Sequence, residues 1–547
     1  MLLVELKIII LGILLIKFFK MQNKAKFIPL SDKQGNIFTG WIIDNSEPWM
    51  IPYANTPYAR NFRVNWRGIS IAPWFYQFWD SLTGSDYPRG IWAYYRSVIA
   101  NDRIVVRYNI DSTHKLASVN PSTWAQTSIT TASNITSDNR MNFISGNDSL
   151  YCMNWVDSMG KLNWTTYTVP SIGISLKPAF WAFFDNSFFV AGDPSVPNNL
   201  YKSEENNPES FTWTGSDVFT SSYPIVWLAS AAQTLYVFSE NTIDMINNNS
   251  IKQIGSSLVY TSIPLEANEW AMNHNCIAVF WRDVYFLSKS LKIKQIAPNS
   301  VLHYDIKELS HRANSWINKT MELLDSDQSS AFCYVIPEQQ LIKWFVKSKG
   351  SSFNDLCIIY NTEYDQFLCD TNRAFYGWVN YKTQNFTISQ VEPKIYKDEY
   401  GSTNDDTAIQ FTYRTKVMTL WTPTLNKLLR QLRTYLWLNQ IWEVYQNVYA
   451  DWGLIDSKLI DWTTIPTPSG WIATKAIWTY AIWTEWLEGN LNDTLYNTTI
   501  VRDKGYLRVK AKEFYVEYVS YKLWTQLLLQ NLEAQVEQLH YLDTPHY

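Results

Sequence analysis

The sequence predicts an all-β protein, a β-propeller of about six blades followed by a C-terminal β-rich region and a short terminal helix. Three observations predict it: a composition rich in aromatic, β-branched and turn-forming residues, a strand pattern that repeats every 38 to 49 residues, and a change of texture near residue 395. With 547 residues, the chain exceeds the size of one hydrophobic core, so we expect a ring of repeats or several packed units.

The repeating unit is a polar turn followed by three or four β-branched or aromatic residues. Asn147-Asp148-Ser149 precedes Leu150-Tyr151-Cys152, for example, and Asp185-Asn186-Ser187 precedes Phe188-Phe189-Val190. Strand starts of this kind lie 46, 38, 47, 49 and 48 residues apart, at Ile104, Leu150, Phe188, Leu235, Val284 and Phe332. This period, with several strands per unit, is typical of a propeller, although an array of β-sandwiches also produces turn-then-strand segments.

Five regions follow from the pattern. Residues 1–20 form a hydrophobic N-terminal extension, 21–54 an N-terminal arm, 55–395 the propeller, 396–520 the C-terminal β-rich region, and 521–547 a C-terminal helix and tail. The apolar run at 8–16 is too short to span a bilayer. We favour the interpretation that residues 1–20 result from the choice of an upstream start codon and that Met21 is the true start. The alternative is an uncleaved signal anchor.

Two segments of the last third are ambiguous or helical in their spacing. Residues 427–438 carry leucines that fit either a helix or a buried strand. Within residues 525–542, Glu533 and Glu537 would lie on one side of a helix. The other side would carry the apolar residues, which are near helical spacing: Leu528, Leu529, Leu532, Val536 and Leu539. We therefore expect an amphipathic helix at the C-terminus.

Charge and cysteine content exclude some classes of protein. The net charge of -4, from 46 basic and 50 acidic residues, provides no basic field for a dedicated nucleic-acid binder. The five cysteines are scattered without a CxxC pair, which fits a reducing compartment better than a disulfide framework.

No motif of an enzyme is present. The sequence lacks GxGxxG, GxxxxGK[ST], HExxH and GxSxG, and the close pair His303 and His311 has no third ligand nearby. A propeller hydrolase needs carboxylates that converge at the ring axis, and no spacing marks such a pair. We therefore predict a protein that is not an enzyme, with no catalytic, cofactor-binding or metal-ligating residue and no cofactor.

Four segments share a family pattern: Ala59-Arg60-Asn61-Phe62-Arg63-Val64 through to Pro73, Phe189-Val190-Ala191-Gly192-Asp193-Pro194 with 199–203, the strand and turn at 235–243, and Thr412-Tyr413-Arg414-Thr415-Lys416 through to Lys427. They resemble the β-propeller tail hub or packaged-DNA stabilisation proteins of short-tailed bacteriophages. The motifs are short and are spread over most of residues 50–440.

The resemblance implies a virion protein of the phage tail, assembled in the cytoplasm of the bacterial host. Its partners would be other copies of the chain in a homo-oligomeric ring, the portal and adaptor, and the tail needle or nozzle. The ring would close or extend the DNA exit channel and retain packaged DNA. Double-stranded DNA would pass without sequence-specific binding, which suits a mildly acidic chain, and no membrane is implied.

Tryptophan is unusually frequent and glycine unusually rare, with 27 and 19 residues respectively. Tryptophan also follows Asn or Asp where glycine would give a standard hairpin turn, at Trp66, Trp155, Trp164, Trp452 and Trp462. One hypothesis is that many of these positions are UGA codons that the host reads as glycine. The alternative is a tryptophan-rich carbohydrate binder.

Two further function classes stay open beside the tail protein. A glycan-binding propeller, on a cell surface or as a receptor-binding part, predicts exposed tryptophan clusters in concave sites. A propeller glycosidase is the weaker alternative and predicts a cleft with paired carboxylates of perturbed pKa.

Overall fold

The computed structural model describes most of residues 58–399 and strands from the rest of the chain. The longer stretches outside the description are 1–25, 30–57, 80–87, 96–101, 212–217, 299–303, 400–410, 416–426, 462–499, 521–526 and 539–547, with gaps of four residues or fewer elsewhere. The hydrophobic extension and nearly all of the N-terminal arm lie outside the described residues. The regular secondary structure of the described chain is almost entirely β-strand, which confirms the predicted fold class.

The chain divides into two compact units. One is Trp74–Gly401, and the other combines Met1–Pro73 with Ser402–Tyr547. The first unit is the propeller, which therefore begins at residue 74 where we expected 55, and ends at 401 where we expected 395.

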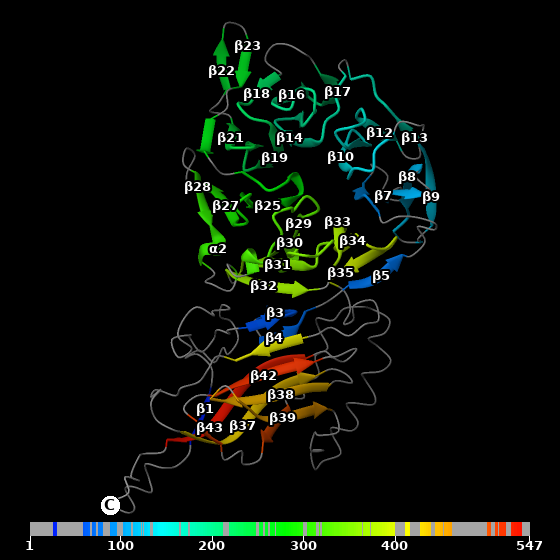
Figure 1. Ribbon diagram of the computed structural model, residues 1–547. Coiled ribbons are helices and arrows are strands. Elements are labelled where there is room, and N and C mark those ends of the chain that lie inside the picture. Colours follow the sequence, from blue (N-terminus) through cyan, green and yellow to red (C-terminus); the bar gives the residue numbers. More distant parts are fainter. Residues whose placement is uncertain are drawn as a thin grey trace, which may run out of the picture. The chain divides into compact units, whose positions relative to one another are not determined.

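Seven groups of four antiparallel strands, the blades, make up the described part of the propeller, one more than the expected number of about six (Figure 1). The first two blades join edge to edge into one eight-stranded sheet through a parallel pair of strands. Blade 1 is β6 (Gly90–Tyr94), β7 (Arg103–Ile110), β8 (Thr113–Val119) and β9 (Gln126–Thr131). Blade 2 is β10 (Asn142–Gly146), β11 (Ser149–Met153), β12 (Gly160–Asn163) and β13 (Thr166–Thr168). Blade 3 is β14 (Phe180–Phe184), β15 (Ser187–Ala191), β16 (Asn199–Glu204) and β17 (Asn207–Phe211), with β18 (Val218–Thr220) added beside β16.

Blades 4 to 6 continue the same order of strands. Blade 4 is β19 (Ile225–Ala231), β20 (Thr234–Ser239), β21 (Thr242–Asn247) and β24 (Ile263–Ala267), and its last connection carries the hairpin β22 (Ile251–Ile254) and β23 (Ser257–Tyr260). Blade 5 is β25 (Ile277–Phe280), β26 (Asp283–Leu287), β27 (Ile293–Pro298) and β28 (Tyr304–Glu308), preceded by the 3₁₀ turn η3 (His274–Cys276) and followed by α2 (Leu309–Arg312). Blade 6 is β29 (Phe332–Ile336), β30 (Leu341–Val346), β31 (Leu356–Asn361) and β32 (Gln366–Thr371), with η4 (Pro337–Gln339) between its first two strands.

Blade 7 is built from both ends of the propeller sequence. It contains β33 (Phe375–Tyr381), β34 (Gln384–Ser389), β35 (Ile395–Asp398) and, as its fourth strand, β5 (Phe75–Trp79). β5 pairs with β35 antiparallel, with Phe75 opposite Asp398 and Trp79 opposite Ile395. The N-terminal strand therefore closes the ring, because it completes a sheet whose other strands come from the last blade.

The repeat marked by the sequence is confirmed for the first five units and displaced in the sixth. Ile104, Leu150, Phe188, Leu235 and Val284 all lie in the second strand of a blade, whereas Phe332 opens a first strand. The turns that precede these second strands have the backbone that Asn and Asp tolerate: φ is 48° at Asn147 and 56° at Asp148 in blade 2.

The propeller core lies in layers between neighbouring blades. All six residues of β20 are buried, because each face of a blade packs against the next blade. Between the first and the last blade, Ile91 and Val106 pack in one cluster with Val379 and Phe386. This layer is what holds the closed ring together beyond the pairing of β5.

The second unit contains two sheets in its described part. One sheet has the order β3 (Phe62–Asn65), β4 (Gly68–Ile71), β43 (Leu527–Gln538), β37 (Lys427–Leu438) and β40 (Ile500–Lys504), with β1 (Lys26–Pro29) paired to β43 and β41 (Val509–Ala511) paired to β37. The other has the order β2 (Tyr58–Arg60), β36 (Phe411–Arg414), β42 (Phe514–Ser520), β38 (Glu443–Ala450) and β39 (Gly453–Asp461).

The expected C-terminal helix is wrong: residues 527–538 form strand β43. β43 pairs with β37 along its whole length and with β4 and β1 on its other edge, so it is an inner strand of the sheet. Residues 531–537 alternate polar and apolar, as Asn531-Leu532-Glu533-Ala534-Gln535-Val536-Glu537, which is the period of a strand. The helical interpretation relied on the spacing of the leucines at 528, 529 and 532 and overlooked this alternation. Residues 427–438, whose spacing allowed either element, form a strand as well.

Two tryptophans among the described residues have the backbone conformation that the recoded-glycine hypothesis predicts. Trp155 and Trp281 both have a φ of 56°, and the Trp281 side chain is 83% exposed. Trp344, in contrast, is fully buried in β30. Recoded glycine therefore suits Trp155 and Trp281 but is not required at Trp344, and Trp66, Trp164, Trp452 and Trp462 lie outside the described residues.

No helix in the described part of the chain combines the length and the apolar character needed to cross a membrane.

Candidate functional site

The first strands of the blades lie on the inner side of the ring (Figure 1). His274, in η3 before blade 5, reaches three other blades. Its ring centroid lies 5.1 Å from that of Phe180 in blade 3, 5.4 Å from Trp227 in blade 4 and 5.9 Å from Trp155 in blade 2. A residue that touches three blades besides its own lies at the axis of the ring.

Arg140 approaches the same centre from the connection that precedes blade 2. Its guanidinium carbon lies 5.3 Å from the ring centroid of Phe332 in blade 6 and 5.0 Å from that of Tyr376 in blade 7. Both contacts are cation–π interactions. We name the residues that meet here the axial cluster: Arg140, Trp155, Phe180, Trp227, His274, Phe332 and Tyr376.

Burial decides the charge states in the axial cluster. Desolvation, with a smaller contribution from the Arg140 charge, lowers the pKa of His274 from 6.5 to about 3, so the imidazole is neutral at physiological pH. Desolvation also lowers the pKa of Arg140 and raises the pKa of the neighbouring Cys276 thiol to about 12. The guanidinium is consequently the single charged group of the axial cluster.

The hydrogen bond between His274 and Asn275 determines the tautomer of the imidazole. Asn275 Nδ2 lies 2.7 Å from His274 Nε2. A side-chain amide nitrogen can only donate, so Nε2 accepts and the single proton of the neutral ring is on Nδ1. His274 thus presents an N–H donor on the other side of its ring.

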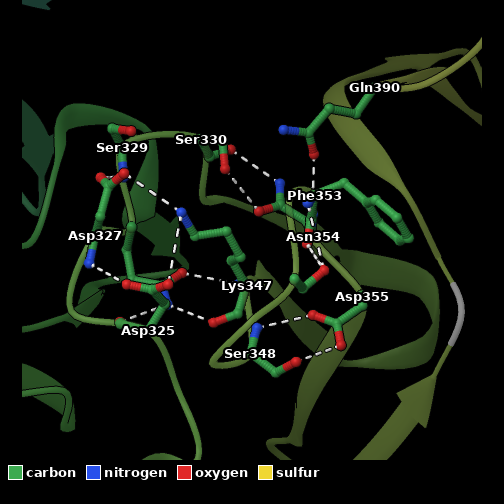
Figure 2. A network of polar contacts seen from close by, with 12 residues as sticks. Asp325, Asp327, Ser329, Ser330, Lys347, Ser348, Phe353, Asn354, Asp355 and Gln390 are labelled. Atoms are coloured by element: carbon green, nitrogen blue, oxygen red, sulfur yellow. Dashed lines mark hydrogen bonds and ion pairs between the residues drawn. The ribbon is translucent and has the colours of Figure 1, made fainter.

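Hydrogen bonds connect the polar loops around blades 6 and 7 (Figure 2). The fully buried Asn354 accepts a bond of 2.9 Å from the Ser330 hydroxyl, and its Nδ2 donates to the carbonyl of Phe375 at 2.8 Å. Its backbone N–H donates to Gln390 Oε1 at 2.9 Å. Because Ser330 leads into blade 6 and Phe375 opens blade 7, Asn354 ties the starts of two first strands together.

The same loop network extends to η3. Asn273 Nδ2 donates to the carbonyl oxygens of Gln328 at 2.6 Å and Ala331 at 3.1 Å. Lys347, whose Nζ lies 3.3 Å from Asp327 and 3.8 Å from Asp325, neutralises the acidic residues of this loop (Figure 2). Hydrogen bonds from Ser329, and then the contact with Lys347, lower the pKa of Asp327. Neighbouring loops thus fix the backbone on either side of His274.

Carboxylates, which a glycosidase would need in a cleft, do lie close together away from the axial cluster, but they are buried inside the protein. Between blades 6 and 7, Lys343 Nζ lies 2.7 Å from Asp398, Arg373 Nη1 lies 2.6 Å from Asp398, and Arg373 Nη2 lies 2.8 Å from Asp370. Glu399 also pairs with Lys343, and the Tyr334 hydroxyl donates to Asp398. These acidic and basic side chains are at most 2% exposed, so the ion cluster can stabilise the closing blade but cannot receive a substrate.

The motif segments lie in structural turns and strands. Gly192 has a φ of 84°, and a Cβ there would lie 2.5 Å from a ring atom of Phe180. Asp193 accepts from the Ser195 hydroxyl at 2.6 Å and from the backbone N–H of Lys177 at 2.8 Å. The sequence 191–194 therefore encodes a tight turn of blade 3, and the segments 59–64 and 412–416 contribute to paired strands of the other unit.

Sequence reasoning named no site residue, and it missed the axial cluster. Arg140 and His274 carry no local spacing signal, since their neighbours in the cluster come from distant blades. The only available signal was a polar histidine segment, 273–276, immediately before the apolar run 277–280. Among the described residues, no group of three or more His, Cys, Asp or Glu side chains is arranged to hold a metal ion. His303 lies outside the described residues.

Comparison with known proteins yields similarity of fold alone. No family model matches the chain, and no curated protein matches it. Among solved structures, YCF48 from Cyanidioschyzon merolae is similar over 59% of this chain and 98% of its own, with 8% identity and a TM-score of 0.38. Raptor from Chaetomium thermophilum shares 10% identity with a TM-score of 0.38, over 60% of this chain and 29% of Raptor.

PorZ, a surface component of the type-IX secretion system of Porphyromonas gingivalis, is similar over 72% of this chain and 47% of its own, with 10% identity and a TM-score of 0.35. The chain thus spans less than a third of Raptor and about half of PorZ. At such low identity these likenesses carry nothing about function, and the propeller fold itself follows from the strand pairing described above.

Proposed function

We propose that this chain is a structural protein of a bacteriophage tail, which assembles as a homo-oligomeric ring below the portal and adaptor and closes or extends the DNA exit channel. The proposal begins from the four motif segments that resemble tail hub proteins. Those segments build turns and strands, which is the use expected of residues in a scaffold.

The observation that carries an assembly role is the axial cluster. Side chains from blades 2 to 7 meet at the centre of the propeller, so a DNA duplex has no path along that axis. A channel for DNA would therefore have to lie between several copies of the chain. The proposed function consequently needs a closed ring of copies, and that requirement can be tested directly.

The test is native mass spectrometry of the purified full chain, alone and after co-expression with the portal and adaptor encoded next to it. We expect one defined ring stoichiometry, and capture of the adaptor by the ring. A chain that stays monomeric at micromolar concentration and captures neither protein would rule the proposal out. Sequencing of the flanking DNA is an independent check, because terminase, portal and capsid genes should lie beside the gene.

One observation favours glycan binding as a second candidate function. Trp281, at the tip of the β25–β26 hairpin, exposes 83% of its side chain, and indole faces stack on sugar rings. On this alternative a glycan array should show saturable binding that Trp281→Ala abolishes, while the exposed neighbour variant Arg282→Gln keeps it. Absence of saturable binding by the wild-type chain would remove this candidate.

A further inference from the structure

Arg140 is a positively charged, partly exposed side chain of the axial cluster, and one of its donors is buried without a partner. Its Nη1 is buried and has no hydrogen-bond partner within the described protein. The rings of Phe332 and Tyr376 stabilise the charge through their faces, but they accept none of the in-plane N–H bonds of a guanidinium. No carboxylate is among the groups that influence the pKa of Arg140.

His274 adds a second donor at the same place. Its Nε2 is engaged by Asn275, so its proton is on Nδ1. The Arg140 charge is close enough to contribute to the lowered pKa of His274. A cationic donor and a neutral donor therefore lie near each other in the axial cluster.

We propose that the axial cluster is a binding site for a small oxyanion, which Arg140 and His274 Nδ1 hold between the surrounding aromatic rings. A buried donor without a partner is unfavourable, and a bound anion compensates it with charge-assisted hydrogen bonds. We expect a small ligand, because aromatic side chains from several blades crowd this place. This inference is independent of the proposed tail function, and it gives the axis a role in stabilising the propeller.

Thermal unfolding of the full chain tests the site. Inorganic phosphate and acetate are compared with chloride at equal ionic strength, so that the two arms distinguish a tetrahedral from a planar oxyanion. The variant is Arg140→Met, which keeps the length of the side chain and removes the charge. The control is Arg282→Gln, at the exposed tip of the β25–β26 hairpin.

We expect at least one of the two oxyanions to raise the melting temperature of the wild-type chain and of R282Q by a few degrees. An oxyanion at 100 times its Kd raises the apparent folding equilibrium constant about 100-fold. R140M should lose this shift. In chloride alone, R140M should melt at or above the wild-type temperature, because the buried donor without a partner is gone.

The proposal fails if neither oxyanion shifts the wild-type chain, or if R140M keeps the full shift. If R140M does not fold, calorimetric titration compares the wild-type chain with Arg140→Lys, which keeps the charge and loses the planar fork of donors. Affinity for the oxyanion should then fall at least tenfold. Equal affinity in the two proteins would overturn the assignment of Arg140.

Discussion

The imidazole of His274 is a base that folding keeps neutral. Its pKa is 6.5 in the ordinary state and about 3 in the folded propeller, chiefly because of burial. Below pH 6.5 the unfolded chain takes up a proton that the folded chain does not, so stability falls as the pH falls, and continues to fall down to about pH 3. At pH 5 the loss from this one residue is about 2 kcal/mol.

His274→Gln is therefore expected to make the propeller less sensitive to acid. Urea unfolding at pH 7 and at pH 5 should show a difference between the two pH values that is about 2 kcal/mol smaller in the variant than in the wild-type chain. The absolute stability of the variant is no part of this prediction, since ring contacts to three blades are lost at both pH values. An unchanged difference would mean that His274 titrates normally.

Gly192 and Gly350 have almost the same backbone and very different surroundings. Their φ angles are 84° and 85°, but a Cβ at Gly192 would lie 2.5 Å from Phe180 and 2.8 Å from Ala179, whereas a Cβ at Gly350 would meet nothing within 4 Å. The pair separates the cost of a strained backbone from the cost of a steric clash.

Gly350→Ala should destabilise the propeller by about 1 kcal/mol, the cost of the left-handed backbone alone. Gly192→Ala should cost at least about 3 kcal/mol, because Phe180 must also move within the core layer between blades 3 and 4. Chemical denaturation of both variants measures the two costs. Equal costs would contradict the packing described around Gly192.

At the scale of elements, the closing blade depends on charges as well as on strand pairing. Asp398 is the last residue of β35, opposite Phe75 of β5, and it accepts from Lys343, Arg373 and Tyr334. Removal of one member of such a buried group leaves the others uncompensated.

Asp398→Asn should destabilise the propeller by about 3–5 kcal/mol. The matched control is Lys292→Gln, which removes an ion pair of 3.0 Å to Glu308 whose side chains are 47% and 26% exposed. This control should cost under about 1 kcal/mol, because water screens an exposed pair. Thermal unfolding compares the two variants, and a mild effect of D398N would show that the ion cluster is dispensable.

At the scale of the whole molecule, the position of β5 predicts which fragment of the chain is the smallest stable propeller. β5 belongs to the compact unit Trp74–Gly401 and fills the fourth place in blade 7. Without it, β35 would become an exposed edge strand, and exposed edges promote aggregation.

A fragment of residues 74–401 should fold by itself and show cooperative unfolding by circular dichroism. A fragment of residues 88–401, which lacks β5, should melt about 10 °C lower or aggregate. If the shorter fragment were as stable as the longer one, closure by β5 would have no energetic importance.

The all-β fold and the approximate length of the repeat were predictable from the sequence because they depend on local interactions. Turns such as Asn147-Asp148 need residues that tolerate a positive φ, and the following strand is buried in every one of its residues, so each hairpin is visible in a short window. The motif around Gly192 is visible for the same reason, since the turn itself requires that residue.

Only the tertiary structure decided the number of blades, the strands that pair with residues 527–538, and the axial cluster. The seventh blade takes its fourth strand from the other end of the propeller, and β43 pairs with β37, β4 and β1. Arg140 and His274 meet because closure of the ring brings the first strands of all blades to one axis. Contacts between residues far apart in the chain have no period or spacing in the sequence, so no local pattern could have indicated them.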